Sequence, residues 1–279
     1  MRAALVQLRS GDDPAANLPV TLGLLAQAAE DGAELILTPE CTNMVSASRA
    51  RQDVALTSEA EDLTLTAIRK LAVERGVSVL IGSLLLKTGD ADGRFANRSF
   101  LIGPDGAIRA RYDKIHMFDV DLGAGETYRE SARFRPGDRA VTADVCDATL
   151  GLTICYDMRF AGLYRDLAKA GAQILTVPSA FTVPTGRVHW EVLLRARAIE
   201  TGCFVLAPAQ GGVHSASEGA ARETWGHSLA VSPCGEILAE AGTDPCVTMV
   251  DIDLAGVARA RARIPSLGHD RAYAGPAPD

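Results

Sequence analysis

The stretch that decides how this chain folds is Leu150-Gly-Leu-Thr-Ile-Cys155-Tyr-Asp-Met-Arg-Phe160. Its first half is apolar and includes the β-branched residues Thr153 and Ile154, which predicts a buried strand. The composition changes at Cys155, and a helical pattern begins beyond it. A thiol between a strand and a helix lies where backbone N–H groups and the helix dipole can stabilise a thiolate. Position alone favours a second interpretation, because most free cysteines in strands are small, inert core residues.

Composition limits the classes of protein to which the chain can belong. Its 279 residues contain no linker rich in Ser, Gly or Pro, so we expect a single domain over 1–279, with a tail at about 265–279 lying on the surface or at a dimer contact. Hydrophobic residues make up 47% and the net charge is −7, which predicts a large core and argues against nucleic-acid binding. No apolar run is long enough to span a membrane, and residues 1–8 predict a first strand in place of a signal peptide.

Cysteine and histidine spacing predicts neither a disulfide framework nor a metal site. There is no CxxC pair and no HExxH motif. We therefore expect a cytoplasmic protein that needs no metal and no cofactor. The six cysteines are Cys41, Cys146, Cys155, Cys203, Cys234 and Cys246.

Strands and helices alternate along the first third of the chain. Apolar periodicity predicts strand, helix, strand, helix and strand at 3–8, 14–31, 35–37, 58–75 and 77–81. Ser58 and Glu61 form the expected capping box of the second helix. Alternation of this kind predicts crossover connections and parallel strands with helices packed on one face.

The second half resembles the first in its order of elements. Expected strands and helices follow at 140–145, 149–154, 161–170, 174–177, 189–200, 203–207, 247–252 and 254–263. Turn residues predict one hairpin around 104–106 and another around 232–235. Two similar halves predict an α/β fold, a four-layer α-β-β-α sandwich with its sheets packed together. The polar segment 119–138 has no period, and irregular segments of this length are often functional.

Three side chains at expected strand ends could act together. A nucleophilic thiol needs a base, an acid for the leaving group, and donors for the developing oxyanion. Glu40 could move the proton, Cys155 could attack, and Lys114 with the backbone N–H of Tyr156 could hold the oxyanion. Taken singly, each residue is better explained by a structural role: Glu40 as a cap after a strand, Lys114 as a solvated cation and Cys155 as a buried thiol.

Three motifs carry a resemblance to a known family. In order they are Thr38-Pro-Glu40, Tyr112-Asp-Lys-Ile-His-Met-Phe-Asp119 and Gly151-Leu-Thr-Ile-Cys-Tyr-Asp-Met-Arg-Phe160. They resemble the catalytic motifs of the nitrilase (carbon-nitrogen hydrolase) superfamily, and the likeness continues through residues 178–181, 189–200 and 225–228. It implies a Glu40-Lys114-Cys155 triad, a nitrilase-type α-β-β-α fold, a homodimer or larger homo-oligomer, and Glu130 as a second glutamate that orients the lysine and the attacking water.

Within the superfamily, the motifs resemble the amidase branch that contains deaminated-glutathione amidase and omega-amidase. This implies hydrolysis of a small, carboxylate-bearing amide through a thioester, with ammonia or an amine released. Deaminated-glutathione amidase is the better match; omega-amidase acting on 2-oxoglutaramate or 2-oxosuccinamate, and an N-carbamoyl amino acid hydrolase, are alternatives. Tyr156, Arg159, Ser179 and Phe181 are the expected substrate contacts. Arg159 could pair with a substrate carboxylate or hold a neighbouring loop or dimer contact.

Two interpretations belong to other classes. A papain-like protease would also use a thiol, but it needs a partnered histidine. A non-catalytic interaction protein on the same fold would leave Cys155 unreactive toward iodoacetamide near neutral pH.

Overall fold

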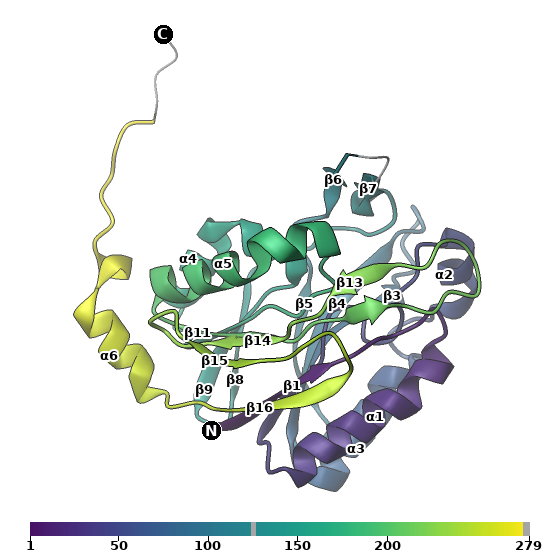
Figure 1. Cartoon of the computed structure of the whole chain (residues 1–279), viewed down its shortest axis with the longest axis horizontal. Coiled ribbons are helices and arrows are strands. Elements are labelled where there is room, and N and C mark those ends of the chain that lie inside the picture. Colours follow the sequence, from purple (N-terminus) through teal and green to yellow (C-terminus); the bar gives the residue numbers. More distant parts are fainter. Residues whose placement is uncertain (124–126, 276–279) are drawn as a thin grey trace.

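Two six-stranded sheets pack face to face, and helices cover the outer face of each (Figure 1). This computed structural model describes residues 1–123 and 127–275. The first sheet has the order β16-β1-β2-β3-β4-β5 and the second β15-β14-β11-β10-β9-β8. The expected four-layer α-β-β-α sandwich is therefore confirmed.

The first half of the chain builds most of the first sheet and its helices. These elements are β1 (Arg2–Gln7), α1 (Pro14–Glu30), β2 (Leu35–Leu37), α2 (Arg49–Ala55), α3 (Leu63–Arg75), β3 (Ser78–Lys87), β4 (Phe95–Ile102) and β5 (Ile108–Asp113). The last strand of the sheet, β16 (Cys246–Asp251), returns from the far end of the chain and pairs antiparallel with β1.

The second half builds the second sheet and its helices. These elements are β8 (Val141–Val145), β9 (Ala148–Leu152), α4 (Ala161–Lys169), β10 (Ile174–Thr176), α5 (Val183–Thr201), β11 (Phe204–Ala207), β14 (Leu229–Val231), β15 (Ile237–Glu240) and α6 (Ala255–Arg263). Smaller elements are the ribbons β6 (Asp119–Asp121) with β7 (Thr127–Arg129) and β12 (Gly211–Val213) with β13 (Glu223–Trp225), and the 3₁₀ turns η1 (Glu130–Ala132), η2 (Cys155–Arg159) and η3 (Ser266–Gly268).

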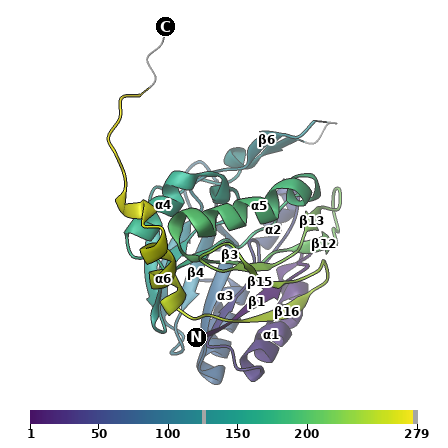
Figure 2. The ribbon, with the colours of Figure 1, turned by 60° about the vertical axis from the view of Figure 1, so that its left-hand side comes forward.

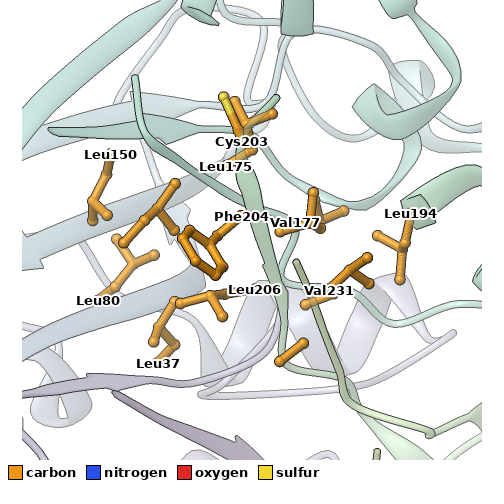
Figure 3. Close-up of a cluster of buried hydrophobic side chains, with 14 of the residues drawn as sticks. Leu37, Leu80, Leu150, Leu175, Val177, Leu194, Cys203, Phe204, Leu206 and Val231 are labelled. Atoms are coloured by element: carbon orange, nitrogen blue, oxygen red, sulfur yellow. The ribbon is translucent and has the colours of Figure 1, made fainter. Parts of the chain in front are cut away.

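Apolar side chains from both sheets meet between the layers. Leu37 and Leu80 of the first sheet belong to one buried cluster with Leu150 and Leu206 of the second (Figure 3). Each is fully buried, which stabilises the fold by about 1.5–3 kcal/mol per side chain. Strands buried on both faces lose the alternation of polar and apolar residues, which explains the continuous apolar runs in the sequence.

Two expected helix boundaries were wrong. The helix expected from residue 58 begins at Leu63, because Asp62 caps it by accepting from the N–H of Leu65 at 2.8 Å. Ser58 instead donates to Glu61 at 2.8 Å ahead of the helix. The helix expected from residue 189 begins at Val183, since a proline fits its first turn.

The polar segment 119–138 is more ordered than its composition suggests. It holds the β6–β7 ribbon and the η1 turn; residues 124–126 lie outside the described part. Asp270 in the expected tail pairs with Arg165 and Lys169 of α4, and the chain then extends away from the layers (Figure 2). Within the described ranges, no helix has both the length and the apolar character needed to cross a membrane.

Candidate active site

Three strand ends position the three side chains expected to act together. Glu40 follows β2, Lys114 directly follows β5, and Cys155 follows β9. Strands β2 and β3 are parallel and β5 is antiparallel to β4, so β2, β3 and β5 all point toward the same edge of the first sheet. The carboxyl ends of strands are where α/β sheets gather ligands, and here two sheets contribute to one site.

Gly82 in β3 allows the two sheets to approach each other beside this site. A Cβ at this position would lie 2.1 Å from the carbonyl oxygen of Thr38 and 2.4 Å from the Cβ of Pro178. The carbonyl of Pro178 in turn accepts from the N–H of Cys155 at 2.9 Å. The absence of a side chain at Gly82 thus brings the segment before Glu40 against the segment that holds Cys155.

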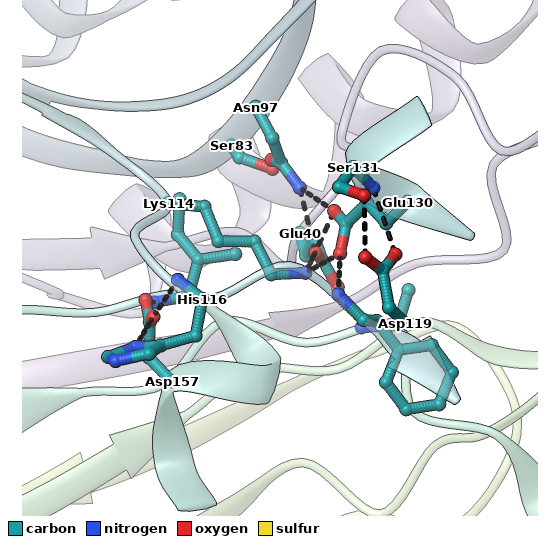
Figure 4. A network of polar contacts seen from close by, with 12 residues as sticks. Glu40, Ser83, Asn97, Lys114, His116, Asp119, Glu130, Ser131 and Asp157 are labelled. Atoms are coloured by element: carbon teal, nitrogen blue, oxygen red, sulfur yellow. Dashed lines mark hydrogen bonds and ion pairs between the residues drawn. The ribbon is translucent and has the colours of Figure 1, made fainter. Parts of the chain in front are cut away.

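Lys114 is buried between two carboxylates (Figure 4). Its Nζ lies 2.8 Å from Oε1 of Glu40, and 3.0 and 2.9 Å from the two oxygens of Glu130. The backbone N–H of Phe118 donates to Glu130 Oε2 at 2.6 Å, which fixes that carboxylate. Two carboxylates therefore orient one ammonium group in a site shielded from water.

Two further donors hold Glu40. Asn97 Nδ2 donates to Oε1 at 2.9 Å, and the backbone N–H of Ala180 donates to Oε2 at 2.9 Å. Asn97 also reaches Glu130 at 3.3 Å, so one side chain from β4 touches both glutamates. The orientation of Glu40 therefore depends on β4 and on the segment after β10.

Cys155 sits at a tight bend at the start of η2. Its φ of 49° lies in the left-handed region, which costs a residue with a Cβ about 1–3 kcal/mol and is common at functional sites. The N–H of Tyr156 lies in the first turn of η2, where backbone donors lack intrahelical partners. The bend thus presents both a thiol and a backbone donor.

Asp157 fastens this bend to the segment that carries Lys114. Its fully buried carboxylate accepts from Tyr112 Oη at 2.6 Å, from His116 N at 2.9 Å and from Ile154 N at 2.9 Å, and it contacts His116 Nδ1 at 2.7 Å. Because Tyr112 and His116 flank Lys114, the lysine and the nucleophile share one support.

The surrounding charges favour a protonated thiol beside an ionised Glu40. Burial, and then the charge of Glu40, raise the pKa of Cys155 above its ordinary value. Burial alone would raise the pKa of Glu40 as well, but Lys114 outweighs it and the pKa is lowered. Burial opposes the charge on Lys114, yet Glu130 and Glu40 raise its pKa well above the usual value. The resting site thus holds a thiol, a base and a cation.

A cavity of about 470 Å³ opens onto these groups. Volumes of 300–1,000 Å³ are typical of sites for small molecules. Its walls are formed by polar groups from the site and by apolar side chains from β3, β7 and the loop after β2. The residues that line it include Glu40, Cys41, Met44, Leu85, Lys114, Tyr128, Arg129, Arg133, Cys155, Tyr156, Ala180, Phe181 and Arg222. No histidine lines it within the described ranges.

The four expected substrate contacts occupy different places. Tyr156 and Phe181 line the cavity. Arg159 lies beside it, with its guanidinium 5.8 Å from the Tyr156 ring centre, 5.5 Å from that of Phe181, and 3.3 Å from His189 Nδ1. Ser179 is fully buried and donates to the carbonyl of Val177 at 3.0 Å, so its side chain faces the sheet and does not line the cavity.

The sequence interpretation missed Asn97, Asp157 and Arg222 as members of this site. Asn97 is hidden inside an apolar strand, and Arg222 lies in a polar loop before β13. Asp157 was visible two residues after the thiol, where a carboxylate could have indicated a buried anchor. Among the described residues, no cluster of three or more His, Cys, Asp or Glu side chains is arranged to hold a metal ion.

Comparison with known proteins identifies the family. The carbon-nitrogen hydrolase family model matches residues 2–262. The chain is 38% identical over 269 residues to deaminated glutathione amidase of Yersinia enterocolitica, covering 96% of this chain and 92% of that protein. It is 36% identical over 272 residues to omega-amidase NIT2 of Bos taurus, covering 97% and 95%.

Among solved structures, the C. elegans NitFhit protein superposes with a TM-score of 0.88 at 34% identity. The match covers 97% of this chain and 65% of that longer one. Family model, relatives and fold agree with the arrangement of the site. The chain belongs to the carbon-nitrogen hydrolase family of the nitrilase superfamily and is an amidase.

Proposed function

We propose that Glu40, Lys114 and Cys155 form the catalytic triad of this amidase, with Glu130 as a supporting carboxylate. The observation that carries the proposal is the shared Lys114, held within 3.0 Å of both glutamates beside a buried thiol. A cation that two carboxylates orient can stabilise an oxyanion without reorganising during the reaction. The N–H of Tyr156 supplies the second donor.

The reaction follows from the protonation states. Glu40 takes the thiol proton as Cys155 Sγ attacks the amide carbonyl, and a tetrahedral oxyanion forms against Lys114. Glu40 then gives that proton to the amide nitrogen, the C–N bond breaks, and the acyl group remains on Cys155 as a thioester. Water, deprotonated by Glu40, cleaves the C–S bond; the acid leaves and the thiol regains its proton.

The substrate is a small amide that bears a carboxylate. The relatives' names, deaminated glutathione amidase and omega-amidase, support this class. Arg159, beside Tyr156 and Phe181 at the edge of the cavity, is the proposed partner of a carboxylate on the acyl half. Arg159→Ala should raise KM selectively for carboxylate-bearing amides; a loss of the fold would contradict the binding role.

Ammonia or amine release from a panel of substrates tests the function. The panel holds deaminated glutathione, 2-oxoglutaramate, an N-carbamoyl amino acid and a simple nitrile, with Cys155→Ala as the blank. We expect turnover of deaminated glutathione above that of 2-oxoglutaramate. Preference for 2-oxoglutaramate or for the carbamoyl compound would favour the corresponding alternative, and activity on the nitrile alone would refute amide hydrolysis.

The non-catalytic alternative predicts a different behaviour of Cys155. It requires a thiol that iodoacetamide does not modify near pH 7. Selective alkylation of Cys155 over the buried Cys203 would exclude that alternative, since both thiols are shielded but only Cys155 lines the cavity.

A homodimer is also proposed. Along α5, Val188, Val192 and Ile199 share one helical face and are 59%, 66% and 53% exposed. An apolar stripe of this kind indicates a protein contact, and a second copy is the proposed occupant. Light scattering should give twice the chain mass, and Val192→Glu should shift it toward the monomer; a monomeric wild-type protein would contradict the proposal.

We also propose a cytoplasmic location and a single domain. All six cysteines are free thiols in the structure, which favours a reducing cytoplasm. The family model spans nearly the whole chain, which supports one carbon-nitrogen hydrolase domain.

A further inference from the structure

Arg222 is a cation in the cavity wall that the triad mechanism does not use. It lies in the loop before β13, half-buried, with its guanidinium 5.8 Å from the ring centre of Tyr128. Its Nη2 donates to the carbonyl of Ala180 at 2.9 Å. Its Nε is buried and has no hydrogen-bond partner among the described residues.

No carboxylate of the described residues lies within ion-pair distance of Arg222. The fully buried cation of the cavity, Lys114, is already shared by Glu40 and Glu130. A buried charge is stable only when it is paired and hydrogen-bonded, and a guanidinium matches the two oxygens of a carboxylate. The free Nε donor, with no described carboxylate at ion-pair distance, therefore points to an anionic ligand.

The position of Arg222 indicates which half of the substrate carries that anion. The Ala180 carbonyl binds Arg222, while the Ala180 N–H binds Glu40 Oε2 at 2.9 Å. Glu40 protonates the departing nitrogen. Because the N–H of Ala180 contacts Glu40 and its carbonyl contacts Arg222, Arg222 lies close to the group that acts on the leaving amine. Arg159 lies elsewhere, between the rings of Tyr156 and Phe181.

We infer that Arg222 binds the carboxylate on the amine half of an N-substituted amide and thereby determines the specificity for the leaving amine. The inference rests on the proposed amidase function and adds a second carboxylate site to it. A substrate of this class carries one carboxylate on each side of the scissile bond. The 470 Å³ cavity has room for both halves.

A matched pair of substrates tests this assignment. Both are 2-oxoglutaramate substituted on the amide nitrogen, one with a carboxymethyl group and the other with an isobutyl group of similar shape and no charge. We expect wild-type kcat/KM to favour the carboxymethyl compound by about 10- to 100-fold, the size of a charge-assisted contact. In Arg222→Gln, which keeps a donor for Ala180, this ratio should fall to about 1.

Two further variants separate this role from a structural one. Arg222→Lys keeps the charge and should restore part of the ratio. Arg159→Met should lower kcat/KM for both compounds while preserving their ratio, because both carry the same acyl half. Wild-type enzyme that hydrolyses both compounds equally, or a ratio unchanged in Arg222→Gln, would overturn the role of Arg222 alone. Absence of amide hydrolysis by the wild type would instead refute the proposed function.

Discussion

Replacing Glu40 with glutamine separates proton transfer from the reactivity of the thiol. Glu40 accepts from three donors: Lys114 Nζ at 2.8 Å, Asn97 Nδ2 at 2.9 Å and Ala180 N at 2.9 Å. Glutamine has nearly the same shape but only one acceptor oxygen. In either orientation its NH₂ group faces at least one of these donors, and each unsatisfied buried group costs about 1–3 kcal/mol. We therefore expect a folded protein with a lower Tm.

In Glu40→Gln, turnover should fall while alkylation of Cys155 is retained or accelerated. Loss of a general acid–base removes about 10²- to 10⁴-fold from kcat. After burial, the charge of Glu40 is what raises the pKa of Cys155, so the substitution lowers that pKa and increases the thiolate fraction at pH 7. Alkylation of Cys155 by iodoacetamide should be as fast as in the wild type or faster.

Both quantities are measurable on one preparation. Release of ammonia or amine from the panel substrate that the wild type turns over fastest gives kcat, and mass spectrometry over time gives the alkylation rate at Cys155. Glu61→Gln, which changes an exposed glutamate outside the cavity, is the matched control and should alter neither. Wild-type turnover in Glu40→Gln, or a parallel loss of alkylation in a folded protein, would refute the role given to Glu40.

Three other predictions follow from the same contacts. Activity is lost as Glu40 gains a proton, and the pKa of Glu40 is lowered. The acid limb of the kcat/KM profile should therefore lie below about pH 4.3, the usual pKa of a glutamate. An acid limb near pH 6.5 would instead indicate a histidine base. Gly82→Ala should reduce both Tm and kcat, since its Cβ would lie 2.1 Å from Thr38 O, at a cost of about 1–3 kcal/mol. Gly23→Ala, with no atom within 4 Å, is its control and should leave both unchanged or raise Tm slightly. Asp157→Asn should lower Tm and slow turnover by displacing the Cys155 bend, and unchanged thermal unfolding would contradict the anchoring role.

The layered fold was predictable because it depends on local patterns. Continuous apolar runs such as 35–37 and 174–177 indicate strands buried on both faces, and intervening helical spacing indicates parallel connections. Boundaries were less predictable. The start of α3 depends on whether Ser58 or Asp62 accepts from a free backbone N–H of the helix. Both residue types are favoured as helix N-caps, so the sequence does not distinguish them.

That Glu40, Lys114 and Cys155 lie at one cavity could be predicted, because each residue follows a recognisable strand and lies in a motif. Their supports could not. Asn97 holds Glu40 from 57 residues away and Tyr112 donates to Asp157 from 45 residues away, so neither role leaves a local signal. Such contacts exist only after the two sheets have packed together.

Charge balance supports a role for Arg222, which the sequence interpretation did not single out. Ionised Glu40 and Glu130 with protonated Lys114 sum to −1, so the triad region alone would repel an anionic substrate. Lys114 cannot attract a substrate carboxylate, because both neighbouring glutamates already occupy it. Burial opposes the charge on Arg222, but the nearby Cys41 and Glu40 raise its pKa, and its positive charge brings the sum to zero. Entry of a carboxylate into this cavity therefore depends on cations other than Lys114, and Arg222 is one of the arginines in its wall.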